Sequence, residues 1–228
     1  MWTARSKLSF PFPKMIRFSV VIPNLQTPTV GQTVESLEHQ SYTPCQVIVV
    51  GMDNHNLIRE TDLVHFDHSD VPLLPAKARN RGAAQAQGDV IAFIDADCIA
   101  QPDWLSVLAE RFTDPAVNVV GGGVDIRSHN FWTLADNIGM FYEYLTSRPS
   151  GLRQQLPSLN LAIRRQVFHD IGGFDEIRLT SEDSDLTFRL RRQGIHCTSS
   201  HARWWCMYRL VIGPPTYSGT ISCTASTR

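Results

Sequence analysis

The sequence predicts an α/β fold with a mostly parallel sheet, and three observations lead to this expectation. Short β-branched runs alternate with amphipathic helical segments through the first half of the chain. Proline and glycine lie at the ends of these segments, and two aspartates follow directly after an apolar run. Strands that alternate with helices form parallel sheets covered by helices, and such sheets bind ligands beyond the carboxyl ends of their strands.

The first strand is expected at residues 16–22, IRFSVVI, where β-branched and aromatic residues dominate, and it should end at Pro23. A helix should then run to about Gln40, capped by Thr27 or Thr29. Its apolar positions recur at helical spacing: Val30, Val34 and Leu37. This segment supplies the first strand–helix unit.

Two further strands follow, and each ends in acidic residues. Residues 47–50 form an apolar run, and the turn GMDNHN after it carries Asp53. A helix is expected to begin at Pro75 and to end at Gly88, because proline suits the first turn and glycine the residue after the last. Residues 90–94 then form a buried strand.

The second half of the chain contains more helices than strands. A helix after Pro102 has one apolar face, and residues 118–120 form a short strand. The apolar stripe of residues 131–145 is interpreted as core packing, in preference to a cofactor or membrane role. Residues 150–157 are expected to be a loop that could cover a site, and residues 164–171 a short helix.

Length and composition favour one compact, soluble enzyme-sized unit. The chain has 228 residues, 43% of them hydrophobic, and a formal net charge of −1, which gives no general attraction for nucleic acid. Its five cysteines lie far apart, as is typical of free thiols in a reducing compartment. With neither a signal peptide nor a membrane-spanning run, we expect a cytoplasmic protein, and peripheral membrane association stays open.

Asp95 and Asp97 are the candidate metal ligands. They follow a buried strand one residue apart, and hard carboxylate oxygens suit Mg²⁺ or Mn²⁺, which in turn neutralise phosphates. Arg79 lies in the helix before that strand and could bind a phosphate through its forked guanidinium. For its neighbours Lys77 and Arg81, a solvated helix face is the favoured interpretation.

A second acidic group lies at the start of a later helix, which Ser181 is expected to cap. Glu182, Asp183 and Asp185 would complement the helix dipole there, which is the simpler interpretation. An ionised carboxylate in this place can also act as a general base toward a hydroxyl. Both interpretations stay open on the residues alone.

Six segments in order resemble family 2 glycosyltransferases of the GT-A fold, which are inverting enzymes that use nucleotide-sugar donors. They are FSVVIP, SLEHQSY, VIVV, PAKARNRGAAQAQGDVIAFIDADC, LNLAIRRQVFHDIGGFDE and SEDSDLTFRLRRQG. The resemblance covers roughly residues 16–209. It implies a nucleotide-binding half at residues 16–125 and an acceptor-binding half at residues 126–209. Residues 1–15 are expected to be an N-terminal tail, and residues 210–228, which have turn formers and no period, a disordered or poorly packed tail.

The resemblance also implies a role for each matched residue. Asp97 would hold Mn²⁺ or Mg²⁺ at the diphosphate, with Asp95 beside it near the ribose or base. Donor contacts would come from Pro23, Asp53 and Arg79.

On the acceptor side, the resemblance implies that Asp183 is the catalytic base and Glu182 its neighbour. Asn160 and Asp185 would help to bind the acceptor. The expected donor is a nucleotide-diphosphate sugar, with a UDP-sugar favoured, and the acceptor is a carbohydrate or a lipid-linked molecule. The activity would be metal-assisted hexosyl transfer with inversion.

Three departures from the family pattern keep other interpretations open. Gly51 and Met52 occupy positions where members carry acids, and Cys206 stands where many carry a histidine, with His201 nearby. The QxxRW pattern of processive synthases is absent, which favours single addition. A degenerate member that only binds a nucleotide is one alternative, and a magnesium-dependent phosphatase of the haloacid dehalogenase type is a weaker one. A nucleotidyltransferase would need a glycine-rich loop after the first strand, which NLQTPTVG does not provide.

Overall fold

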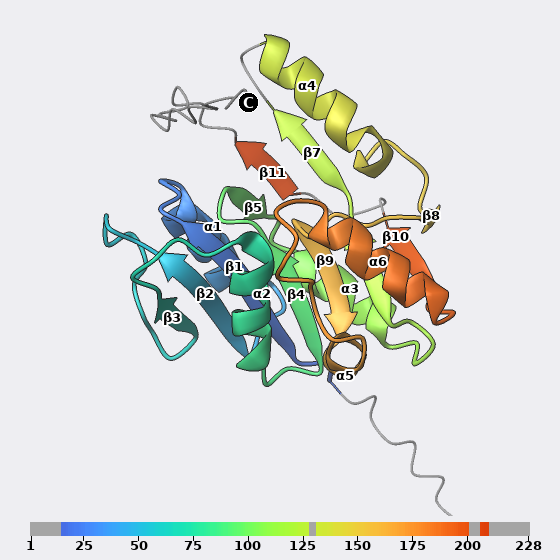
Figure 1. Cartoon of the computed structure of the whole chain (residues 1–228), viewed down its shortest axis with the longest axis horizontal. Helices are drawn as coiled ribbons and strands as arrows, with labels where there is room; N and C mark the ends of the chain where they lie inside the picture. The colour runs from blue at the N-terminus through green and yellow to red at the C-terminus, as the bar shows by residue number, and fades with distance from the viewer. Residues whose placement is uncertain (1–14, 128–130, 201–205, 210–228) are drawn as a thin grey trace, which may run out of the picture.

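The computed structural model describes residues 15–127, 131–200 and 206–209, and it contains a central sheet of eight strands (Figure 1). In spatial order these are β3 (Val64–His68), β2 (Gln46–Met52), β1 (Phe18–Leu25), β4 (Val90–Ile94), β9 (Asn160–Arg164), β6 (Val119–Gly122), β10 (Cys197–Ser200) and β8 (Gly151–Leu152). The first four strands run parallel, as do β6 and β10. The predicted α/β class with a mostly parallel sheet is therefore confirmed.

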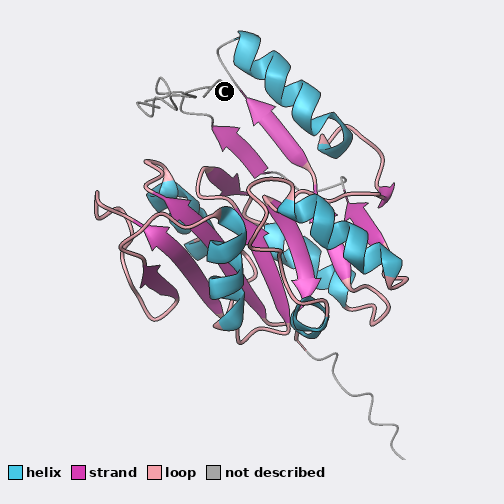
Figure 2. Cartoon of the chain, in the orientation of Figure 1, coloured by secondary structure: helices cyan, strands magenta, loops and turns pink. Residues whose placement is uncertain are grey.

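Helices cover both faces of this sheet (Figure 2). The described residues contain the helices α1 (Val30–Glu38), α2 (Pro75–Ala84), α3 (Trp104–Phe112), α4 (Phe131–Phe141), α5 (Arg165–Asp170) and α6 (Glu182–Arg192) and the 3₁₀ turn η1 (Tyr142–Tyr144). All of the α-helices except α4 pack on this sheet (Figure 2). Side chains of α1 and α3 share one hydrophobic core, and those of α2, α5 and α6 share another. Because side chains alternate along a strand, β4 sends Ala92 into the first core and Phe93 into the second.

The first strand does not end at Pro23, as the sequence had suggested, but continues to Leu25. Pro23 pairs with Val50 of β2, whereas the pairing of β1 with β4 ends at Val21. Beyond that point one edge of β1 is released from β4, so a proline without an N–H is tolerated there. The prediction erred because proline is excluded only where its N–H would bond a neighbouring strand.

Helix α2 begins at Pro75, as predicted, but ends at Ala84 and not at Gly88. Gly88 instead lies against β1, where a side chain would not fit: a Cβ atom there would lie 2.5 Å from the backbone nitrogen of Ser19. This glycine is required for close packing and not for ending a helix.

The sequence analysis did not predict four strands of the main sheet: β3, β9, β10 and β8. β3 has few apolar residues and lies at the edge of the sheet, where the usual buried run is not required. β9 is apolar, but it comes between a loop and a helix, with no turn to separate it from α5. It runs antiparallel between β4 and β6, so a strand from the predicted acceptor half completes the sheet of the donor half.

A second, three-stranded sheet lies beside the main one and contains β5 (Cys98–Ala100), β11 (Cys206–Arg209) and β7 (Val124–Arg127). Helix α4 lies beyond β7, away from the main sheet (Figure 1). The core-packing prediction for α4 holds for Phe141, which packs against the first core, but it is wrong for Phe131, whose side chain is 72% exposed. The predicted loop at residues 150–157 contains the short strand β8.

Within the described ranges, no helix combines the length and apolar character that crossing a bilayer would require. Of the expected tail at residues 1–15 only Met15 is described, and the expected tail at residues 210–228 lies outside the described residues, as does His201. Cys206 begins β11. Cys45 and Cys197 are free thiols, as predicted for these two.

Candidate active site

The predicted donor residues gather where β1, β2 and β4 end. These strands are parallel neighbours, so their carboxyl ends meet at one edge of the sheet. Pro23 lies near the end of β1, Asp53 directly after β2, and the acidic pair directly after β4. The Asp53 side chain is buried and accepts a hydrogen bond from the backbone N–H of Ile58 at 2.8 Å, which orders the loop after β2.

Gly51, one of the departures from the family pattern, has a structural reason. Its φ is +136°, and a Cβ atom there would lie only 1.9 Å from the carbonyl oxygen of Asn24. An aspartate at this position would collide with β1. The acidic side chain at the end of β2 is therefore Asp53, two residues later.

The turn between the two aspartates is held by α1. The Thr33 hydroxyl donates a hydrogen bond of 2.7 Å to the carbonyl oxygen of Ala96, the residue between Asp95 and Asp97. Thr29, expected to cap α1 with its side chain, makes no capping bond and instead donates to the same carbonyl at 3.4 Å. These two contacts fix the backbone of the acidic turn. The sequence analysis did not predict them, because the residues that they join lie more than 60 positions apart in the chain.

Among the described residues, no basic side chain forms an ion pair with Asp97. Burial, and then the negative charge of Asp95, raise the pKa of the Asp97 carboxyl. A cation would offset both effects, so this donor set fits Mg²⁺ or Mn²⁺. The described residues contain no group of three or more histidine, cysteine, aspartate or glutamate side chains placed to hold a metal. Two carboxylates are nonetheless sufficient for these ions, which usually keep waters and substrate phosphates as further ligands.

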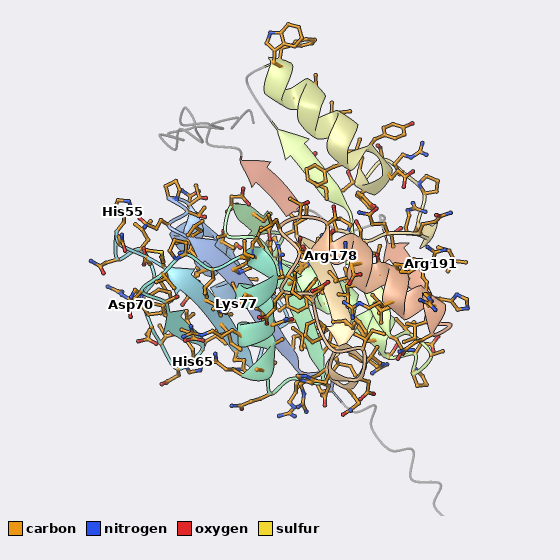
Figure 3. The ribbon with its side chains drawn as sticks, in the orientation of Figure 1. His55, His65, Asp70, Lys77, Arg178 and Arg191 are labelled. Atoms are coloured by element: carbon orange, nitrogen blue, oxygen red, sulfur yellow. The ribbon has the colours of Figure 1, made fainter. Side chains whose placement is uncertain are left out.

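Arg79 connects the two acidic groups. Its Nη2 lies 2.7 Å from Oδ1 of Asp95, and its Nη1 lies 2.7 Å from Oε1 of Glu182. The side chain is only 4% exposed, whereas Lys77 on the same helix is exposed, as predicted, and is labelled in Figure 3. Burial lowers the pKa of Arg79, but the charges of Asp95 and Glu182 raise it by more, so the guanidinium stays charged.

Asp183 is held at the start of α6 by backbone N–H groups. Ser184 N–H donates to its Oδ1 at 2.7 Å, and Ser158 N–H donates to its Oδ2 at 3.3 Å. Ser181 occupies the N-cap position as predicted, but it makes no side-chain capping bond and has left-handed backbone angles (φ 62°, ψ 27°). The pKa of the Tyr144 phenol is raised to about 12, first by burial and then by the negative charges of Glu143 and of Asp183.

Asn160 lies in the core and its side chain is only 1% exposed. Its Oδ1 accepts a hydrogen bond from Nε1 of Trp104 at 2.9 Å, and its Nδ2 donates to the carbonyl oxygen of Gly123 at 3.1 Å. Gly122 is required beside it, because a Cβ there would lie 2.1 Å from the Asn160 amide nitrogen. These contacts favour a positioning role, and direct acceptor binding by Asn160 stays a prediction without support from its geometry.

Asp185, the other predicted acceptor residue, is engaged by two arginines. Its Oδ2 lies 2.7 Å from Nε of Arg189, one turn later on α6, and its Oδ1 lies 3.2 Å from Nη2 of Arg178. Arg178 is labelled beside α6 in Figure 3. The acceptor role of Asp185 stays a prediction, and the contacts show that it ties α6 to the loop before it.

Comparison with known proteins agrees with this arrangement. The sequence profile described as glycosyl transferase family 2 matches residues 19–174. The pre-mycofactocin glycosyltransferase of Mycobacterium tuberculosis is 30% identical over 141 residues, covering 59% of this chain and 29% of the relative. Glycosyltransferase AglE of Haloferax volcanii is 24% identical over 194 residues, covering 80% of this chain and 64% of the relative. The chain thus spans less than two thirds of these relatives.

Solved structures share the fold. GalNAc-T7 with UDP, GalNAc and Mn²⁺ superposes with a TM-score of 0.67 at 17% identity, covering 88% of this chain and 45% of that one. The mannosyltransferase PcManGT from Pyrobaculum calidifontis, in complex with GDP-Man and Mn²⁺, gives 0.65 at 19% identity, covering 84% and 56%. At these identities the likeness shows the fold alone, which is the predicted GT-A type.

Proposed function

The chain belongs to glycosyl transferase family 2, and from this membership we propose that it transfers a hexose from a nucleotide-diphosphate sugar to an acceptor hydroxyl with inversion. One observation carries the proposal: Arg79 joins the acidic pair after β4 to the acidic pair that begins α6. This connection supports a proposed metal-and-phosphate site and a proposed base beside each other at one edge of the sheet. A phosphatase of the haloacid dehalogenase type is not supported, because the chain has the family 2 profile and the GT-A fold.

Asp183 is proposed as the general base. The acceptor oxygen forms a bond to the anomeric carbon, the bond from that carbon to the diphosphate oxygen breaks, and the hydroxyl proton passes to Asp183. The backbone N–H groups of Ser158 and Ser184 orient its carboxylate for this transfer. The diphosphate leaves on the face opposite the attacking oxygen, which inverts the configuration.

Asp97 and Asp95 are proposed to hold Mn²⁺ or Mg²⁺. The ion, when bound, would supply positive charge for the leaving diphosphate. The support on the protein side is the raised pKa of Asp97, which burial and the charge of Asp95 cause and which a cation would lower. Relatives of the same fold were solved with UDP or GDP-Man and Mn²⁺, which favours the same ligand class here.

A thermal-shift screen tests the donor proposal. UDP-, GDP- and dTDP-sugars are each added with Mn²⁺ and with EDTA, and a ligand that binds the folded state preferentially raises the unfolding temperature. We expect a shift that requires both sugar nucleotide and cation, with UDP-sugars the favoured class. Absence of any shift across the three series would overturn the donor assignment. Binding without transfer or donor hydrolysis would instead support the degenerate, non-catalytic alternative.

A further inference from the structure

We propose that Arg79 is a positioning residue that holds Asp95, at the end of β4, and Glu182, at the start of α6, in one fixed arrangement. These two residues are 16 and 103 positions away from Arg79 in the chain, and both ion pairs measure 2.7 Å. We further expect this arrangement to place Asp183 opposite the donor, and this part of the proposal rests on the proposed function. The coupling of the two ion pairs is independent of the proposed function.

The neighbouring residue on α2 strengthens this connection. Asn80 Nδ2 donates to the carbonyl oxygen of Phe174 at 2.8 Å, and the Phe174 N–H donates back to Asn80 Oδ1 at 2.9 Å. The Phe174 ring lies 5.7 Å from the guanidinium carbon of Arg79. Helix α2 therefore contacts both ends of the segment between α5 and α6. Asn80 binds Phe174 near the start of this segment, and Arg79 forms an ion pair with Glu182 where α6 begins.

The geometry argues against a direct phosphate contact by Arg79. Both terminal nitrogens are occupied by carboxylates, and Nε is buried with no hydrogen-bond partner among the described residues. An incoming diphosphate would have to break one of the ion pairs to reach this side chain. The sequence-based expectation that Arg79 binds the donor directly is replaced here by an indirect role through Asp95.

Arginine suits this role better than lysine does. The planar guanidinium presents donors in two fixed directions, so it can serve two carboxylates at once, whereas an ammonium acts as a point charge. A buried ion pair is weak support for a stability role, because two apolar side chains often stabilise as well or better. Breaking one side, in contrast, leaves a buried charge without its partner.

Hydrogen exchange of the ligand-free chain tests the coupling. Asp95→Asn and Arg79→Lys are each expected to speed amide exchange at residues 184–188, in the first turns of α6, by about tenfold. Since both changes break the same connection, the double variant should exchange no faster than the single ones. Asp97→Asn is the matched control, because Asp97 lies outside the ion pairs of Arg79, and it should leave α6 unchanged. Unaltered exchange in β1 verifies that each variant is folded.

Two outcomes would overturn the proposal. In one, Asp95→Asn leaves amide exchange in α6 unchanged while Arg79→Lys speeds it. Arg79 would then stabilise α6 without coupling it to Asp95. In the other, the effects of Asp95→Asn and Arg79→Lys multiply in the double variant, which would make them independent. Neither depends on a donor, so a failed donor screen would remove the proposed function and leave this result standing.

Kinetics with a donor identified by the screen separates positioning from phosphate binding. Arg79→Lys is expected to lower kcat by about 10²-fold. Because Asp95 is a proposed ligand of the ion, any rise in the Kd for the donor with Mn²⁺ should accompany this loss of kcat and not replace it. Arg81→Lys, on the same helix in an ion pair with Asp67, is the matched control and should change neither. A Kd at least tenfold higher with kcat preserved would show direct donor binding by Arg79 and would refute the positioning role.

Discussion

Replacing Asp183 by asparagine separates the proposed base from the structure that holds it. The amide keeps one carbonyl oxygen, which can still accept the 2.7 Å hydrogen bond from Ser184 N–H. Its NH₂ group would then face the Ser158 N–H, which now donates to Oδ2 at 3.3 Å. One long hydrogen bond is lost, and the side chain can no longer accept a proton.

The expected losses of stability and of activity differ enough to be told apart. Losing one partly exposed hydrogen bond costs about 1 kcal/mol, which lowers the unfolding temperature of a chain this size by about 2–4 °C. Removing a general base lowers kcat by about 10²- to 10⁴-fold, equivalent to about 3–5 kcal/mol of activation free energy. The stability loss leaves the protein almost fully folded, so it cannot account for the loss of activity.

The assay compares sugar transfer, donor binding and the unfolding temperature in three proteins. Wild type and Asp183→Asn should bind donor and Mn²⁺ with similar Kd values, because the base lies on the acceptor side. Asp170→Asn is the control for the same chemical change, and it should retain full turnover. Asp170 is exposed at the end of α5, and within the described residues its side chain bonds only to Gln166. Turnover of Asp183→Asn within threefold of wild type would refute the assignment.

Two further substitutions and one labelling experiment test other parts of the structure. Asp97→Asn should weaken the Mn²⁺-dependent donor shift at least about tenfold, and an unchanged titration would contradict the metal assignment. Asn160→Leu should lower the free energy of unfolding by about 2–6 kcal/mol, because the Trp104 N–H and the Gly123 carbonyl both lose their buried hydrogen-bond partner. Urea titration measures this loss, and a value under about 1 kcal/mol would disprove the positioning role of Asn160. Iodoacetamide at pH 8 should label exposed Cys45 well before Cys197, since burial raises the pKa of Cys197 to about 11 and suppresses its thiolate; equal rates by peptide mass spectrometry would argue against that burial.

Local signals were enough to predict the parts of the fold that are built locally. The β-branched run of β4 and the helical spacing of α1 and α3 predicted elements that the structure contains. The prediction that Asp95 and Asp97 belong to a binding site followed from the rule that parallel sheets bind ligands beyond the carboxyl ends of their strands. These predictions use neighbours within about ten residues of one another, where helix and strand periodicity determine which side chains share a face.

The signals that were misread depend on contacts between distant parts of the chain. Pro23 stays within β1 because β4 no longer pairs with that part of the strand, and Gly88 is selected by the close backbone of β1. Thr33 resembled an ordinary helical residue, yet its hydroxyl holds the carbonyl of Ala96, 63 positions later. Sequence periodicity contains no information on such pairs, so a helix residue and a site residue cannot be told apart before the fold is known.

The charges around Arg79 explain why the two acidic pairs divide their roles as proposed. One guanidinium shared by Asp95 and Glu182 engages one member of each pair. Asp97 is half-buried, with its pKa raised, and is the member of its pair that gains most from a divalent cation. Asp183 is held by backbone N–H groups and not by Arg79, so its carboxylate can take a proton without breaking the Arg79 ion pairs. The two residues bound by Arg79 therefore fix the arrangement of the site, and in the proposed mechanism Asp95 also shares the ion with Asp97, while Asp183 takes the proton.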